Sequence, residues 1–152
     1  PVGGLRGVRP SQPAFRPCLM PAAHHLADVL GQVASVEVTD DDALTVQHDG
    51  TFASLRTVTI ADGLELVSLT QALVWDLTPD ADLRKSVAAQ AAKTMLGTVT
   101  LVEHPGGGVD AERADVVLRY NFPFAGLDDQ ALQTLVLMVL AAGADVRRAL
   151  LD

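Results

Sequence analysis

Apolar residues spaced three and four positions apart predict three helices. The helices are expected near residues 21–31, 78–97 and 128–151. In the second, Thr78 can cap the start, Pro79 suits the first turn, and Leu83, Val87 and Met95 fall on one stripe. The middle of the third helix is apolar all round, so we expect it to be covered on more than one side.

Alternation of apolar and polar residues predicts five strands. They run over residues 44–48, 52–60, 64–75, 98–103 and 115–122. Asp49-Gly50 and Asp62-Gly63 separate the first three, and Asp-Gly between strand-forming residues is typical of a tight hairpin, because glycine adopts a positive φ. In the fifth strand Val116, Leu118, Tyr120 and Phe122 fall on one face and Asp115, Arg119 and Asn121 on the other, which is typical of a sheet with one solvated face.

The strand over residues 64–75 is the longest and carries apolar residues on both faces. Simple alternation puts one set on the first face: Val67, Leu69, Leu73 and Trp75. It puts a second set on the opposite face: Leu64, Leu66, Ala72 and Val74. We therefore expect both faces of this strand to be covered, at least in part.

The chain divides into an arm and one domain. Residues 1–21 contain five prolines and three glycines, which disfavour regular helix and sheet, so we expect a flexible tail or an extended strap. Residues 22–152 suit a single core, since the whole chain has 152 residues of which 49% are hydrophobic. The expected fold class is α+β, in the order α-β-β-β-α-β-β-α, with an antiparallel sheet and helices packed on it.

The charge and the cysteine content of the chain restrict the classes of binding partner and the cellular compartment that we expect. The chain has 11 Lys and Arg against 19 Asp and Glu, a net charge of -8, which argues against nucleic acid and anionic membrane surfaces as partners. Cys18 is the only cysteine, so no internal disulfide can form. The longest uncharged apolar stretch, residues 131–144, is shorter than the roughly 20 residues of a membrane span. We expect a cytoplasmic protein without a transmembrane segment.

Candidate catalytic and metal-binding residues do not converge in the sequence. His24 and Asp28 are spaced to share one helix face, but His48 and His104 stand alone, so surface histidines are the favoured interpretation over a zinc site. The glycines at 106–108 precede a strand instead of a helix, which favours a hairpin loop over a phosphate loop. We therefore expect no metal, no cofactor and no enzymatic activity.

Two stretches resemble a known family. These are SLTQALVWD at residues 68–76 and DVVLRYNFPFAGLDDQAL at residues 115–132. Together with the expected order of elements, they make residues 22–152 similar to the type III secretion chaperones and the related YbjN-like proteins of bacteria. The resemblance implies a small α+β domain, often dimeric, that binds a protein or peptide segment and does no chemistry. The arm has no counterpart in this resemblance.

The expected function is binding of a protein or peptide segment in a groove formed by the sheet and the flanking helices. The candidate lining residues are Val67, Leu69, Leu73 and Trp75. The apolar third helix predicts a homodimer, for which the candidate interface residues are Leu135, Met138 and Val139. The arm carries apolar residues that could fold over the same groove.

Two alternative functions remain. The first is a regulatory module that binds a small ligand in an apolar cavity, which a closed pocket near Trp75 would favour. The second is an enzyme of an unrecognised type, indicated only by scattered histidines and acidic residues. A structure without a polar pocket holding two or more converging titratable groups would discard the enzyme.

Overall fold

The computed structural model describes residues 21–108 and 111–152. These residues form three helices and a six-stranded sheet: α1 (Pro21–Gly31), β1 (Val36–Val38), β2 (Leu44–His48), β3 (Thr51–Ala61), β4 (Leu64–Leu77), α2 (Ala81–Lys93), β5 (Thr98–Pro105), β6 (Glu112–Pro123) and α3 (Asp129–Leu151). The predicted α+β class and the antiparallel sheet are confirmed. The sixth strand is β1, whose three residues are too few to show an alternation in the sequence.

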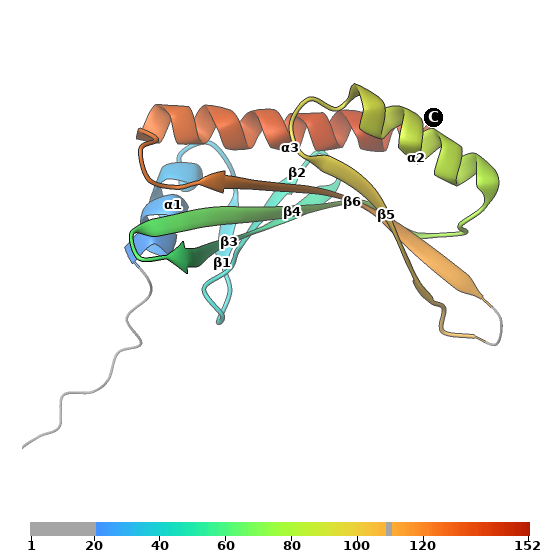
Figure 1. The fold of residues 1–152 in the computed structure, drawn as a ribbon, viewed down its shortest axis with the longest axis horizontal. Helices are drawn as coiled ribbons and strands as arrows, with labels where there is room; N and C mark the ends of the chain where they lie inside the picture. Colours follow the sequence, from blue (N-terminus) through green and yellow to red (C-terminus); the bar gives the residue numbers. More distant parts are fainter. Residues whose placement is uncertain (1–20, 109–110) are drawn as a thin grey trace, which may run out of the picture.

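The strands are arranged in the order β1-β2-β3-β4-β6-β5, and every neighbouring pair is antiparallel. The first four strands follow one another as a meander, whereas β6 returns between β4 and β5. Figure 1 shows the long α3 running along one side of the sheet, with α1 near one end of it and α2 near the other. We call the face under the helices the inner face and the opposite face the outer face.

Only the inner face of β4 is covered within residues 21–108 and 111–152, so the expectation of two covered faces is wrong for this part of the chain. The outer face is polar in its middle, where one cross-strand row runs over all six strands: Glu37, Thr45, Ser54, Thr70, Arg119 and Thr98. Hydroxyl and charged side chains keep their hydration on such a surface, so this part of the face needs no cover.

The core lies between the inner face and α3. Leu132, Val136, Val139 and Leu140 of α3 are buried against the sheet. The helix also contacts α1 and α2, which confirms that it is covered on more than one side. Its start is held by Asp128, whose carboxylate accepts the Ala131 N–H at 2.7 Å.

The second helix is shorter than predicted. Asp80, not Thr78, caps it, and its carboxylate accepts the Leu83 N–H at 2.7 Å. At the other end Thr94 leaves the helical conformation and its hydroxyl donates to the Gln90 carbonyl at 2.9 Å. Met95 therefore lies beyond the helix instead of on its stripe, and it is 91% exposed.

One buried polar contact marks the closest approach of α3 to the sheet. Gln71 of β4 is fully buried, and its Nε2 donates to Thr51 Oγ1 at 2.8 Å and to the Leu140 carbonyl at 3.1 Å. Its Oε1 has no hydrogen-bond partner. Gly143 of α3 lies directly over this amide, since an added Cβ would be 2.6 Å from Nε2 and would overlap Oε1. The position needs glycine because a methyl group there would displace the amide.

We predict that Gly143→Ala destabilises the protein by about 1–3 kcal/mol, because overpacking outweighs the gain of about 1 kcal/mol in helix propensity. Gly31→Ala is the matched control, since Gly31 is also helical and an added Cβ there meets nothing within 4 Å. Urea unfolding measures both changes. In a protein that already carries Gln71→Ala, Gly143→Ala should lower the free energy of unfolding by less than it does in the wild-type chain. Purely additive effects would contradict the contact.

Candidate functional site

Three of the four predicted groove residues lie in the core. Val67, Leu69 and Leu73 are on the inner face of β4 beneath the helices, and each is 0% exposed. Side chains without accessible surface cannot contact a partner while the domain is folded. The prediction that these three residues line a groove is therefore wrong, and only Trp75, which is 45% exposed, lies at the surface.

A bulge in β4 explains why Trp75 is separated from the other three. The register with β6 shifts between Ala72 and Val74, so that Leu73 and Val74 are both buried in the core. Trp75 and Asp76 are both exposed after this shift, and a second register shift lies between Val74 and Leu77. The sequence offers no sign of this bulge, because two consecutive apolar residues also fit a strand covered on both faces.

Trp75 forms an aromatic cluster with residues from two other elements. The ring centroid of Phe52, at the start of β3, lies 5.9 Å from that of Trp75, and Phe52 is 44% exposed. The guanidinium carbon of Arg147, on α3, lies 5.4 Å from the Trp75 ring centroid, which is a cation–π geometry. We call Phe52, Trp75 and Arg147 the Trp75 corner.

The Trp75 corner stands beside an unpaired length of β4. The pairing of β3 with β4 ends at Phe52 and Ala72, whereas β6 still pairs with β4 at Leu77. Residues 74–77 of β4 therefore have a neighbouring strand on one side only, among the residues that the structure describes. At the start of this free β4 edge, Arg147 Nη1 donates to the Leu73 carbonyl at 2.6 Å.

A cluster of charged residues holds the C-terminal end of β4, directly after Trp75. Asp76 has a positive φ of 58°, and its N–H donates to Asp115 Oδ1 at 2.9 Å. The same oxygen lies 3.3 Å from His104 Nε2, and Arg113 Nε lies 3.5 Å from Asp76 Oδ1. The Asp115 carboxylate beside the ring raises the pKa of His104 above its usual 6.5. The cluster thus ties β4, β5 and β6 together where the chain leaves the sheet.

A cavity of about 790 Å³ lies next to this cluster. It is lined by residues of the β4–α2 loop and of the β5–β6 hairpin, among them Glu103, His104, Glu112 and Arg113. Several titratable groups therefore converge in one pocket, so the condition for discarding an enzyme is not met. Three of them already have partners, because Glu103 pairs with Arg84 at 2.6 Å, His104 with Asp115 and Arg113 with Asp76.

The three predicted interface residues of α3 differ in accessibility. Met138 is 53% exposed on the side of α3 away from the sheet, and Leu135 is partly buried beside it. Both line a depression of about 460 Å³. Val139 is 0% exposed and packs on the sheet, so its assignment to an interface is wrong. The helical period of 3.6 residues turns Val139 about 100° away from Met138.

Within residues 21–108 and 111–152, no three His, Cys, Asp or Glu side chains are grouped closely enough to hold a metal ion. No helix in this part of the chain is long and apolar enough to cross a membrane. The predicted arm and Cys18 lie outside the described residues, apart from Pro21, which begins α1. Trp75 lines neither of the two cavities above, so they do not favour the hypothesis of a small ligand in an apolar cavity near Trp75.

Two comparisons with known proteins gave no match: no family model matches the chain, and no curated protein matches it.

We predict that the imidazole of His104 titrates above pH 6.5 and that Asp115→Asn brings its pKa back toward that value. The folded-state pKa is raised, so the stability from this contact is present below pH 6.5 and is lost as the pH rises through the His104 pKa. NMR titration of the His104 ring protons measures the change. Asp145→Asn, which removes the same charge on α3, should leave the His104 pKa unaltered. An unchanged pKa in Asp115→Asn would contradict the contact.

Proposed function

We propose that the protein binds an extended segment of another protein at the Trp75 corner and along the free β4 edge, and that it catalyses no reaction. The observation that carries this proposal is the juxtaposition of Trp75 and Phe52, both more than 40% exposed, with a strand end that has one neighbour only. An extended peptide can pair its backbone with such an edge, while an exposed aromatic pair receives one of its apolar side chains.

Arg147 supports this function by fixing the binding surface in advance. Its guanidinium packs on Trp75 and also donates to the Leu73 carbonyl, so the indole is held between α3 and Phe52. A pre-ordered aromatic side chain loses little conformational entropy when a partner binds. Aromatic residues and arginine are also the types that most often dominate binding energy at interfaces.

The resemblance to the type III secretion chaperones and YbjN-like proteins supports the same function, since that family binds segments of other proteins. The acidic character of the chain is compatible with a carrier that stays in solution and repels nucleic acid. The partner is then recognised through backbone pairing and one or two apolar anchors, which suits many different sequences.

A small polar ligand in the cavity lined by His104 and Arg113 is the second candidate function. Its volume of about 790 Å³ lies within the range of roughly 300–1,000 Å³ that is usual for ligand pockets. Thermal shift measurements with a panel of small polar metabolites, on the wild-type chain and on Arg113→Ala, test this candidate independently of Trp75.

We predict that Trp75→Ala weakens peptide binding at least about 30-fold, because an anchor of this kind contributes 2 kcal/mol or more. The probe is a peptide selected on the wild-type chain from a displayed random library. Calorimetry gives its affinity, and urea unfolding gives stability. Met138→Ala is the matched control, since Met138 is also about half exposed and lies on the opposite layer. A folded Trp75→Ala protein with full affinity would remove the proposed site.

The same peptide tests whether the partner pairs its backbone with the free β4 edge. Methylation of one peptide N–H at a time should weaken binding at every second position, because alternate N–H groups of an added strand face the edge. A peptide that tolerates methylation at all positions would show that no strand is added to β4.

We also propose that the chain forms a homodimer through the outer side of α3. Residues 131–144 carry no charged side chain, although the chain has a net charge of -8. In an antiparallel pair of α3 helices centred on Met138, Asp128 of one copy lies level with Arg148 of the other, which gives opposite charges at both ends. A symmetric pair of this kind closes on itself.

We predict that light scattering gives about twice the chain mass of 16.0 kDa, and that Met138→Glu reduces it to one chain mass by burying a charge at the axis. Met95→Glu is the control, because Met95 is exposed but lies outside α3. A mass of one chain for the wild-type protein at high micromolar concentration would refute the dimer.

A further inference from the structure

A second group of exposed apolar residues lies at the opposite end of β4 from Trp75. On the outer face, Val58 pairs with Leu66 and Leu66 with Pro123, so the three side chains form one cross-strand row. Leu64 lies on the same face two residues before Leu66, and Ile60 is the extra residue of a bulge between Thr59 and Ala61. We call Val58, Ile60, Leu64, Leu66 and Pro123 the end patch.

The end patch gathers exposed apolar residues at one end of neighbouring strands, unlike the polar middle of the outer face. Val58 is 40% exposed, Leu64 is 41% exposed and Ile60 is 59% exposed. Single exposed apolar residues are ordinary, but a group of them at one end of a sheet indicates a surface that something covers. No helix or strand covers it within the described residues.

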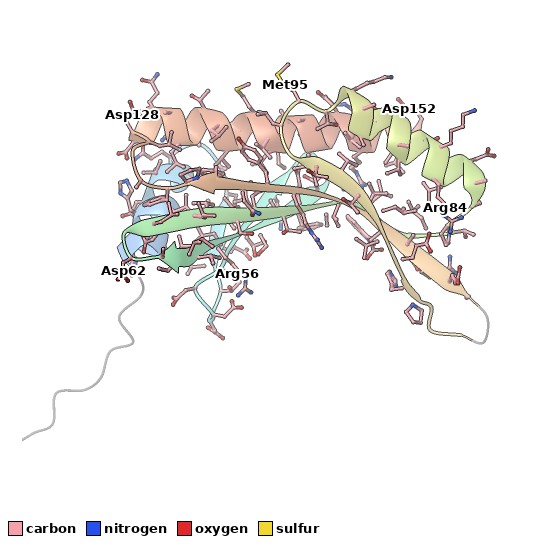
Figure 2. All side chains as sticks on the ribbon, viewed as in Figure 1. Arg56, Asp62, Arg84, Met95, Asp128 and Asp152 are labelled. Atoms are coloured by element: carbon pink, nitrogen blue, oxygen red, sulfur yellow. The ribbon has the colours of Figure 1, made fainter. Side chains whose placement is uncertain are left out.

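The described chain begins beside the end patch. In the first turn of α1, the ring of His25 lies 6.0 Å from that of Phe124, in an edge-to-face arrangement. Phe124 directly follows Pro123, and its N–H donates to the Glu65 carbonyl at 3.0 Å, between Leu64 and Leu66. In Figure 2, Asp62 of the β3–β4 turn is labelled at the same end of the molecule as the start of α1.

We propose that the end patch is covered by the segment that immediately precedes α1 in the same chain, residues 15–20. This segment supplies Phe15, Leu19 and Met20 as apolar contacts. Six extended residues reach about 20 Å, which is enough to pass from Pro21 around the edge of the sheet to its outer face, since a sheet and its side chains are about 10 Å thick.

Charge favours this occupant over a second copy of the chain. All charged residues among residues 1–20 are arginines, and all 19 acidic residues follow them. Arg16 would then lie near Asp62 at the turn beside the patch. A second copy would instead bring a surface of the same negative sign against this end of the molecule, and it would lose the high effective concentration of a tethered segment.

The single cysteine makes the proposal testable in the full chain. Cys18 lies within the proposed segment, and Ile60→Cys places a second thiol in the end patch. In a glutathione redox buffer at low micromolar protein, an intramolecular disulfide between the two should form at least about tenfold faster than in Leu151→Cys, where the new thiol is about as exposed but lies at the C-terminal end of α3. Mass spectrometry of tryptic fragments identifies the disulfide.

Two controls separate docking from chance encounter. The reactivity of each introduced thiol toward a small reagent, measured with Cys18→Ser, corrects for differences in thiol pKa and access. Adding Phe15→Ser and Leu19→Ser to the Ile60→Cys chain should slow the disulfide to the rate of the Leu151→Cys chain. Equal rates in Ile60→Cys and Leu151→Cys would overturn the proposal. Disulfides found only between two chains would also overturn it, and would assign the patch to a second copy.

Discussion

The contact between Gly143 of α3 and Gln71 of β4 sets the geometry on which the candidate site depends. The missing Cβ at Gly143 lets the helix axis come close enough for Gln71 to reach the Leu140 carbonyl. Arg147 lies one helical turn further on the same side of α3, so the same close approach brings its guanidinium to the Leu73 carbonyl and to Trp75. If the helix were held further away, Gln71 would not reach the Leu140 carbonyl and Arg147 would not reach the Leu73 carbonyl.

The bulge in β4 is the second constraint, and it follows from the same packing. Beneath the end of α3 the core takes up both Leu73 and Val74, which a regular strand would place on opposite faces. The extra inward residue shifts the strand, and Trp75 emerges beyond the last residue of β3 that pairs with β4. Core packing and the exposure of Trp75 are therefore linked through the irregular pairing of β4 with β6 in this region.

The sequence predicted the elements better than it predicted the site. Period and turn residues are local signals, so the three helices and the two Asp-Gly hairpins are confirmed. Which face of β4 meets the helices is a tertiary property. Val67 and Leu69 were expected in a groove because nothing local distinguishes a core face from a binding face. The neighbours of Trp75 are Phe52 and Arg147. Both are far from Trp75 in the sequence, so no local pattern predicts these contacts.

The two exposed apolar areas of the sheet lie too far apart to act as one surface. Trp75 and Leu64 are eleven residues apart along β4, which is about 35 Å at 3.3 Å per residue. The polar row through Ser54, Thr70 and Arg119 lies between them and offers no apolar contact. Six extended residues span about 20 Å, so a segment of this length tethered at Pro21 is long enough for the end patch but too short for Trp75. The proposed docking of residues 15–20 on the end patch therefore does not compete with the binding site proposed at the Trp75 corner.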